Sequence, residues 1–320
     1  MHDVTCLGEL LIDFTSLQPG ASIIDTPGFE KHAGGAPANV AVGVSRLGGS
    51  AAFLGMVGDD EFGRYLAKML ADRGVNTAGL RYSRQAHTTL AFVALRADGE
   101  REFIFYRNPG ADMLYSVGDL DEALITAGRI FHHGSISLIA EPNREATLRA
   151  IALARAQGRL ISYDPNLRLN LWPDAACARE GIHLALHTAD LLKVSDEEMT
   201  FLTGETDLDA GMAHLRSLGI PMVVVTLGAQ GCAYSWGDAR GRVTALPRQA
   251  VDTTGAGDAF VAGVLYHLTH LTEDPAHLPA DTIEGILAFA NAVAGYTVTR
   301  RGGIPSMPTL EEVERGGLVF

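Results

Sequence analysis

The chain has 320 residues, of which 47% are hydrophobic and 20% charged, a globular composition that suits one large α/β domain or two domains. Its formal net charge is -13 and it has no basic run, which argues against a nucleic-acid partner, and its three scattered cysteines lack the spacing of a disulfide framework or a zinc site. Neither a basic leader nor an uncharged apolar stretch of membrane length is present, so we expect a soluble cytoplasmic protein without a membrane partner.

Predicted strands and helices alternate along most of the chain. Strands are expected at 4–13, 51–57, 88–95, 102–106, 130–138, 160–163, 191–194, 222–227 and 246–251. Helices are expected after the turn 33–39, at 62–73, at 143–157, after the turn 252–258 and at 285–299. The turn 97–99 (Ala-Asp-Gly) is expected to close the strands 88–95 and 102–106 into a hairpin.

This alternation favours a mainly parallel sheet covered by helices on both faces. The segments 14–32 and 88–108 interrupt it with strand-type sequence, and we expect them to form a small separate sheet inserted in a single domain over 1–320. No Gly-Lys-Ser/Thr loop is present, which excludes a P-loop protein, and no Gly-x-Gly-x-x-Gly follows the first strand, which argues against a Rossmann-type dehydrogenase.

The turn 252–258 (DTTGAGD) is the strongest candidate for a site. Gly255 and Gly257 allow a ligand to approach the backbone at the start of an apolar helix, where free N–H groups and the helix dipole bind anions. Asp258 would repel a phosphate there, and it suits a general base for a hydroxyl that attacks the phosphate. An aspartate in a first helical turn is also a common cap, so this segment alone leaves a structural role open.

A second glycine turn lies at Gly34 and Gly35. It is either a tight strand-to-helix connection or a surface for a polar ligand, with Asn39 as donor and acceptor. Asp13, at the end of the first predicted strand, is either a turn residue or an acceptor for two sugar hydroxyls.

Polar residues also follow later strands, where sites of α/β proteins collect. Arg107 is either a solvated edge charge or a ligand contact, and the turn 164–168 is either an Asx-type turn or part of a site. Glu198 either favours the start of the next helix or holds Mg2+ through water. The turn 226–231 is either an ordinary hairpin or a wall of a nucleotide pocket, whereas the pair His132 and His133 is expected to be structural.

In this order, these pieces resemble the ribokinase-like (pfkB) carbohydrate kinases over almost the whole chain. The N-terminal signature covers 34–63 and the C-terminal one 252–260, and together they are highly specific. Ser195 stands where ribokinases carry Asn, so a direct Asn contact to the metal or to phosphate-bound water is not available. The fructokinase branch is the most similar, through the runs 8–14, 95–103, 107–109, 134–138, 163–168 and 193–198.

The resemblance implies a three-layer α/β/α sandwich with a β-sheet lid, and a homodimer formed through the lids. It implies transfer of phosphate from ATP to O6 of fructose, with Asp258 as the base and the N–H groups of Gly255, Ala256 and Gly257 as an anion hole. The implied sugar contacts are Asp13, Gly34, Gly35, Asn39, Phe92, Phe105, Arg107 and Arg168.

The implied ATP contacts are Lys193, Ser195, Glu198, Thr226, Gly228, Gly231, Gly255, Gly257 and Asn291, with Glu198 ordering the waters of Mg2+. By resemblance alone, K+ is expected at Asp252, Thr254, Thr297, Arg300, Gly302 and Ser306.

Three other functions stay open at this point. A 2-keto-3-deoxygluconate kinase would use Arg107 and Arg168 as cations for its acidic sugar. A nucleoside kinase, or a nucleotide sensor without catalysis, is less favoured, the sensor because Asp258 is present.

Overall fold

Two β-sheets organise the chain, which a computed structural model describes over residues 2–18, 20–95 and 101–316. The strands are β1 (Val4–Leu7), β2 (Leu11–Ser16), β3 (Phe29–Gly34), β4 (Ala51–Gly58), β5 (Asn76–Ser83), β6 (Leu90–Leu95), β7 (Arg101–Tyr106), β8 (Ile130–His133), β9 (Leu160–Tyr163), β10 (Leu191–Ser195), β11 (Met222–Thr226), β12 (Cys232–Trp236) and β13 (Ala239–Val243).

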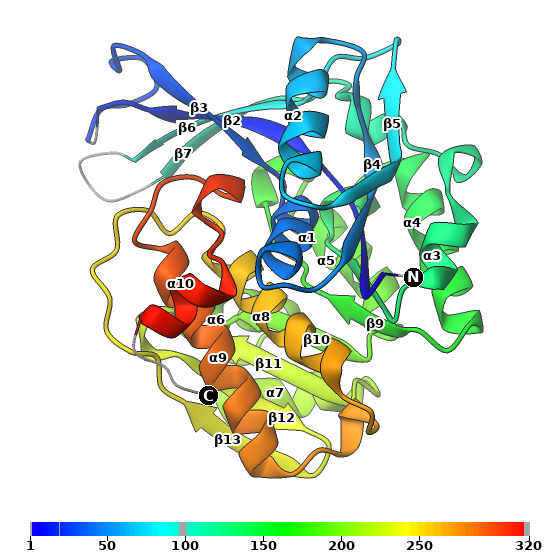
Figure 1. Ribbon diagram of the computed structural model, residues 1–320, viewed down its shortest axis with the longest axis vertical. Helices are drawn as coiled ribbons and strands as arrows, with labels where there is room; N and C mark the ends of the chain where they lie inside the picture. The colour runs from blue at the N-terminus through cyan, green and yellow to red at the C-terminus, as the bar shows by residue number, and fades with distance from the viewer. Residues whose placement is uncertain (1, 19, 96–100, 317–320) are drawn as a thin grey trace.

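The larger sheet has the strand order β13-β12-β11-β10-β9-β8-β1-β4-β5. Its neighbouring strands run parallel, except that β12 pairs antiparallel with both β11 and β13. The smaller sheet, with the order β3-β2-β6-β7, is called the lid sheet below and projects from one side of the molecule (Figure 1).

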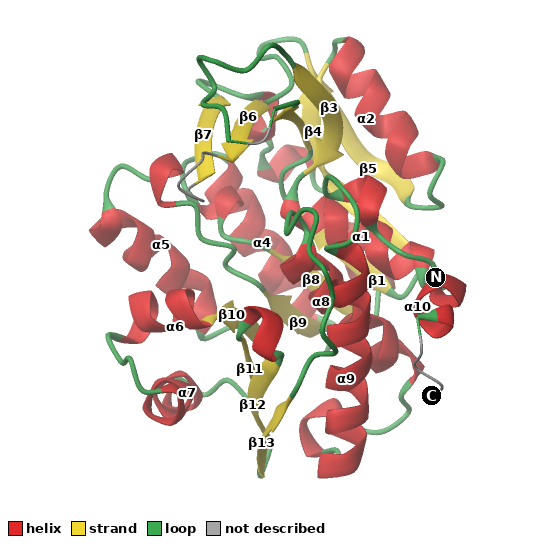
Figure 2. Cartoon of the chain, turned by 90° about the vertical axis from the view of Figure 1, so that its left-hand side faces the viewer, coloured by secondary structure: helices red, strands yellow, loops and turns green. Residues whose placement is uncertain are grey.

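Helices cover both faces of the larger sheet (Figure 2). One face buries its side chains against α1, α2, α8, α9 and α10, and the other against α3 to α7. Within the described residues, none of the helices combines the length and apolar character that crossing a bilayer requires. The helices are α1 (Ala36–Arg46), α2 (Glu61–Ala71), α3 (Glu122–Ala127), α4 (Asn143–Ala156), α5 (Ala175–Leu186), α6 (Asp196–Thr203), α7 (Leu208–Ser217), α8 (Ala256–His270), α9 (Ala280–Thr297) and α10 (Leu310–Arg315).

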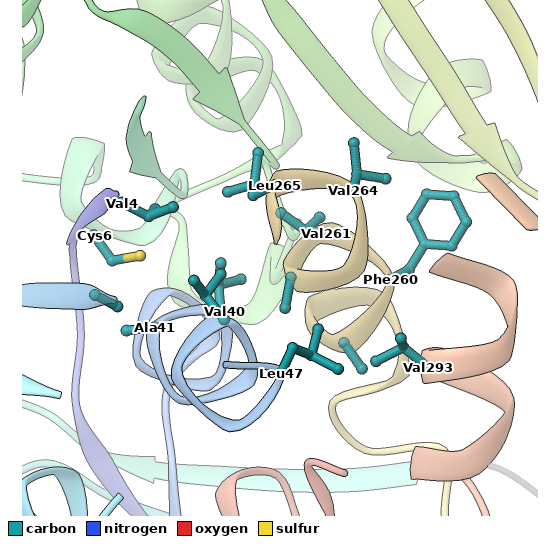
Figure 3. Packing of buried hydrophobic residues seen from close by; sticks show 14 of the residues in the cluster. Val4, Cys6, Val40, Ala41, Leu47, Phe260, Val261, Val264, Leu265 and Val293 are labelled. Atoms are coloured by element: carbon teal, nitrogen blue, oxygen red, sulfur yellow. The ribbon is translucent and has the colours of Figure 1, made fainter. Parts of the chain in front are cut away.

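The contact between α1 and α8 is the centre of the first hydrophobic core (Figure 3). Val40 of α1 lies beside Val261 of α8, Leu47 follows the end of α1 and points toward Val293 of α9, and all four side chains are buried. Since α1 begins at the turn after Gly35 and α8 at the turn after Gly255, this packing also holds the two glycine turns near each other. The predicted three-layer α/β/α class with a small second sheet is confirmed.

The single strand predicted over 4–13 is wrong, because the chain changes sheets inside it. Leu7 still pairs in the larger sheet, whereas Leu11 already pairs with Gly34 in the lid sheet. The bend lies at Gly8, where an added Cβ would come 2.4 Å from Cγ of Pro37. Asp13 consequently lies within a lid strand and not at a strand end.

Three further expectations about strands need correction. Residues 246–251 form a loop and not a strand, and the apolar side chains of Leu246 and Val251 are exposed and have no neighbouring strand to cover them. The strand predicted over 130–138 ends at His133, after which the chain turns into a short 3-10 helix. The edge strand β5 was not predicted, because its outward-facing residues are mostly polar or small.

The α1–α8 contact predicts the effect of adding one methyl group. A Cβ at Gly43 of α1 would come 2.5 Å from Cβ of Ala262 in α8, so Gly43→Ala should lower the free energy of unfolding by about 1–3 kcal/mol. The control is Gly285→Ala in α9, where an added Cβ meets nothing within 4 Å, and which should be neutral or stabilising by up to about 1 kcal/mol. Urea denaturation measures both, and equal effects of the two substitutions would contradict the tight crossing.

Candidate active site

A cleft lies between the lid sheet and the carboxyl ends of the central strands, where the strand order of the larger sheet switches direction between β8 and β1. Crevices at such switch points are the usual ligand sites of open α/β sheets. The lining residues are Glu9, Leu11, Asp13, Thr15, Gly35, Ala36, Asn39, Val93, Phe103, Phe105, Ile136, Asn166, Arg168, Lys193, Thr253, Thr254, Gly255, Gly257, Asp258 and Gly302.

Asp258 lies in the first turn of α8 and is buried at the floor of this cleft. Its Oδ2 accepts a hydrogen bond from Nδ2 of Asn39 at 2.7 Å, and its Oδ1 accepts one from Nδ2 of Asn166 at 3.2 Å. Burial and the neighbouring Asp164 raise the pKa of Asp258 to about 6, although the Asn39 hydrogen bond and the charge of Lys193 oppose the rise. A carboxylate with this pKa is largely ionised at neutral pH and can accept a proton.

The backbone that precedes Asp258 forms an anion-binding position. Gly255 has a left-handed backbone (φ 79°), so that the chain turns directly into α8 and its first N–H groups stay outside the helical hydrogen bonds. Nζ of Lys193 lies over this turn, 2.9 Å from where a Cβ of Gly257 would be. Burial disfavours the charged lysine, but the carboxylates of Asp164 and Glu198 raise its pKa overall. A cation and a helix N-terminus therefore meet at one place.

The second glycine turn forms the wall beside the lid. Asp13 Oδ2 would lie 2.0 Å from a Cβ at Gly34, and the backbone oxygen of Glu9 would lie 2.3 Å from a Cβ at Gly35, whose φ is 114°. Burial raises the pKa of Asp13 to about 7, while the charge of Arg168 opposes the rise. The structure thus brings Asp13, Gly35 and Asn39 into one cleft with Asp258, whereas Gly34 lies behind Asp13 and is not among the lining residues.

One face of the lid sheet covers the cleft, with Val93, Phe103 and Phe105 among the lining residues. Phe92 was predicted as a sugar contact, but it lies on the opposite face, because neighbouring residues of a strand point to opposite sides. There it stacks on Phe14 with ring centroids 5.0 Å apart. Phe103, which was not predicted, lines the cleft together with Phe105.

Arg107 is not among the residues that line the cleft. Its Nε donates to Oδ2 of Asp112 at 2.7 Å, and the two side chains are only 6% and 1% exposed. Asp112 Oδ1 also accepts a hydrogen bond from Thr89, and Nδ2 of Asn143 donates to the Asp112 backbone oxygen. Arg107 therefore forms a buried ion pair with Asp112 at the base of the lid sheet, and it does not line the cleft as a direct sugar contact would.

Glu198 makes a capping box with Ser195 at the start of α6. Its Oε2 accepts from the backbone N–H of Ser195 at 2.8 Å, and its Oε1 accepts from that of Leu167 at 2.7 Å. Neither Ser195 nor Glu198 lines the cleft. Glu198 therefore stabilises the start of α6, which is the structural alternative given for it above. Each of its carboxylate oxygens keeps one lone pair for a further donor such as water.

The other residues predicted for the nucleotide gather away from this cleft, beyond the end of β11. Asn291 Nδ2 donates to the backbone oxygen of Val243 at 3.1 Å, and a Cβ at Gly231 would meet the same oxygen at 2.1 Å. Thr226 pairs with Cys232 in the adjacent strand, and Gly228 begins the turn between them. The four residues share one region of the structure.

Asp252 joins the two loops that were expected to hold a monovalent cation. Its Oδ1 accepts from the N–H and the hydroxyl of Thr254 at 2.9 and 2.7 Å, and its Oδ2 accepts from the N–H of Gly302 at 2.9 Å. Thr297 and Ser306, which flank Gly302 in the sequence, are buried. Their hydroxyls donate to the backbone oxygens of Val293 and Gly303. The donor set is entirely oxygen, which fits a hard cation such as K+ and does not fit a transition metal.

Local sequence patterns do not identify several of the functional candidates. Asn166 and Asp164 belong to a motif that was recognised, but nothing local showed that Asn166 would reach Asp258, 92 residues away. Glu9 accepts from the N–H of Ala36 at 2.7 Å, and burial raises its pKa to about 7. An acidic residue between two apolar strands is the signal that could have identified Glu9.

Comparison with known proteins gives consistent matches along the chain. The sequence matches the family described as pfkB family carbohydrate kinase over residues 1–310. Probable fructokinase-7 of Arabidopsis thaliana is 50% identical over 317 residues, covering 97% of this chain and 91% of the relative.

Two solved structures are similar throughout. A fructokinase from Xylella fastidiosa with bound ATP is 38% identical, with a TM-score of 0.87 and coverage of 98% of this chain and 97% of that chain. A double mutant of the fructokinase from Vibrio cholerae O395, solved with fructose, ADP and potassium ion, is 33% identical, with a TM-score of 0.88 and coverage of 98% of both chains.

Proposed function

The chain belongs to the pfkB family of carbohydrate kinases, and from this we propose that it transfers the γ-phosphoryl group of ATP to O6 of D-fructose. One observation carries the proposal. The ionisable carboxylate of Asp258 lies in the same cleft as an anion-binding helix start and as the polar wall that contains Asp13 and Asn39. A base, a phosphate site and a sugar site are therefore adjacent, as a sugar kinase requires.

Each step of the transfer has a residue suited to it. O6 of the sugar attacks the γ-phosphorus, the bond from that phosphorus to the ADP oxygen breaks, and Asp258 accepts the proton from O6. The N–H groups at Gly255, Ala256 and Gly257, together with Lys193, stabilise the charge on the transferring group. The lid sheet excludes water, so that sugar and not water receives the phosphate.

The sugar contacts are proposed for Asp13, Gly34, Gly35, Asn39 and Arg168, with Phe105 and Phe103 covering the ring. Asn39 Oδ1 is buried beside Gly303 without a hydrogen-bond partner in the described part of the chain, so its contact with a sugar hydroxyl would require this atom to become accessible.

A neutral sugar fits this cleft better than the acidic 2-keto-3-deoxygluconate. The acidic sugar would need cations for its carboxylate, and Arg107 is already neutralised by Asp112. Arg168 remains, but Asp13 and Asp258 both interact with it electrostatically. The fructose-bound structure of a similar protein supports the same choice.

ATP consumption should be fastest with fructose in a panel that also contains ribose, glucose, tagatose and 2-keto-3-deoxygluconate, and phosphorus NMR should identify the product as the 6-phosphate. Asp258→Asn should lower kcat by about 10²- to 10⁴-fold, because it removes the proton acceptor, while calorimetry still detects ATP binding. Turnover of another sugar but not of fructose would overturn the substrate assignment. A kcat close to that of the parent in Asp258→Asn would overturn the general base.

We also propose that Mg2+ accompanies ATP and that K+ occupies the loops joined by Asp252. The oxygens of Asp252, Thr254, Thr297, Arg300, Gly302 and Ser306 would hold K+, which would stabilise the turn that leads into the anion-binding N–H groups. Glu198, whose carboxylate already fixes two backbone N–H groups, would order water on Mg2+. ATP itself would extend from Lys193 and Ser195 toward Thr226, Gly228, Gly231 and Asn291.

Turnover should be lower when K+ is replaced by an organic cation too large for these loops, such as tetramethylammonium, at equal ionic strength. Identical initial rates in the two salts would remove the K+ role. Chelation of divalent ions with EDTA should stop turnover, and addition of excess Mg2+ should restore it.

We propose that the outer face of the lid sheet forms a homodimer. This face carries the aromatic group Phe14, Phe29, Phe92 and Tyr106, whose rings contact one another through Phe92 at centroid distances of 5.0–5.5 Å. Ile104 and Tyr106 are 43% and 64% exposed, which is unusual for large apolar and aromatic side chains that lie side by side. A second copy of the same face would cover them.

Sedimentation equilibrium should therefore give about twice the mass of one chain, and Tyr106→Lys should shift the protein toward the monomer. Leu184→Lys is the control, because Leu184 of α5 is likewise an exposed large hydrophobic residue, at 43% against 64% for Tyr106, but belongs to a helix outside the lid sheet. A monomeric parent, or equal effects of the two substitutions, would contradict this interface.

A further inference from the structure

Asn166 has a backbone conformation that asparagine adopts only at a cost. Its φ is 45°, and it is the one non-glycine residue with positive φ in the ranges that the structure describes. Such conformations cost about 1–2 kcal/mol for residues with a Cβ and persist where surrounding contacts enforce them. Asparagine tolerates them better than most residues, which explains the residue type but not why the turn is left-handed here.

Three hydrogen bonds hold this turn in place. The N–H of Asn166 donates to Oδ1 of Asp164 at 3.1 Å, and the N–H of the next residue, Leu167, donates to Oε1 of Glu198 at 2.7 Å. The backbone oxygen of Pro165 accepts from the N–H of Ser135 at 3.1 Å. Asp164 is itself fixed by Nζ of Lys193 at 3.0 Å. The turn is thus connected to residues on the nucleotide side of the site.

The left-handed turn directs the Asn166 carboxamide at Asp258. Its Nδ2 donates to Oδ1 of Asp258, while Nδ2 of Asn39 donates to Oδ2 from the other side. Each carboxylate oxygen is therefore held by one amide, and the plane of the carboxylate is fixed. One lone pair on each oxygen remains for a proton donor in the cleft.

We infer that Asn166 is a positioning residue, whose carboxamide orients the Asp258 carboxylate toward the attacking hydroxyl. The inference rests on the proposed function, because it gives Asn166 its role through Asp258. Asn166 lines the cleft but the role does not need a sugar contact, since the two hydrogen bonds to Asp258 already fix the geometry. The strained backbone is then explained, because a right-handed turn would aim the carboxamide elsewhere.

The test separates the carboxamide from the backbone. Asn166→Gly keeps a residue that adopts positive φ readily but removes the donor, whereas Asn166→Ala removes the donor and disfavours the turn. Both should lower kcat by about ten- to a hundred-fold, with the KM values for sugar and ATP changed by no more than about twofold. Asn170→Ala, four residues along and exposed, is the control and should behave as the parent.

The pH profile of kcat gives a readout that a merely structural role would not move. In the parent, kcat should fall as the pH drops through about 6, because Asp258 must be ionised to accept a proton. Without the Asn166 donor, the ionised form of Asp258 loses one hydrogen bond, so the pKa of Asp258 should rise. The acidic limb of the profile, where kcat falls, should therefore move to higher pH by about one unit. The charged groups that face Asp258 are Asp164 and Arg168 on the segment that carries Asn166, Lys193 on β10 and, on the lid sheet, Asp13.

Asn166→Asp provides a second variant that also tolerates the left-handed turn. It places a carboxylate beside Asp258, so its kcat should be lower still and its pH limb should move further upward. Melting temperatures and calorimetric ATP binding establish that each variant is folded.

Three outcomes decide the matter. Parent-like kcat and pH profile in Asn166→Gly, with the kcat of Asp258→Asn lowered as expected, would overturn the role of Asn166 and leave the proposed function standing. A kcat for fructose close to that of the parent in Asp258→Asn would overturn the proposed general base itself. A loss of kcat in Asn166→Gly together with the shifted limb supports the carboxamide as the positioning group.

Discussion

The start of α8 combines two electrostatic requirements that oppose each other. Its free N–H groups attract an anion, yet Asp258 places a carboxylate within the same first turn. The carboxylate must stay ionised without repelling the phosphoryl group. Neighbouring side chains meet both requirements. The amides of Asn39 and Asn166 donate to the carboxylate, and Lys193 supplies positive charge over Gly257. The remaining architecture brings these three neighbours, Asn39, Asn166 and Lys193, to the start of α8 from distant segments of the chain.

The two sheets explain how those segments meet. β1 ends at the bend where the chain enters the lid sheet, and β9 and β10 end on the same side of the larger sheet, so Glu9, Asp164 and Ser195 emerge along one edge. The packing of α1 against α8 then joins Asn39 to Asp258 across 219 residues. Hydrophobic burial in the layer beneath the cleft thus sets distances between polar groups above it.

The sequence predicts best what depends on neighbouring residues. Both glycine turns, the apolar face of α8 and most buried strands follow from local patterns, and the family resemblance supplied the order of the parts. What failed depends on partners that lie far away in the chain. Phe92 and Phe105 look alike in sequence, and only the pairing of β6 with β2 and with β7 decides which face of the lid each side chain takes. Arg107 looked like a ligand contact because nothing local marked Asp112 as its buried partner.

The two glycines of the cleft wall also restrict how this site can change over evolutionary time. A single methyl group at Gly34 would collide with the Asp13 carboxylate, and one at Gly35 with the backbone of Glu9. Enlarging or narrowing the pocket from that wall therefore disturbs its own scaffold. Phe103 and Phe105, in contrast, stand on a lid strand and meet the cleft with side chains alone. Substitutions on that strand can therefore reshape the pocket at a lower cost to the backbone than substitutions at the two glycines.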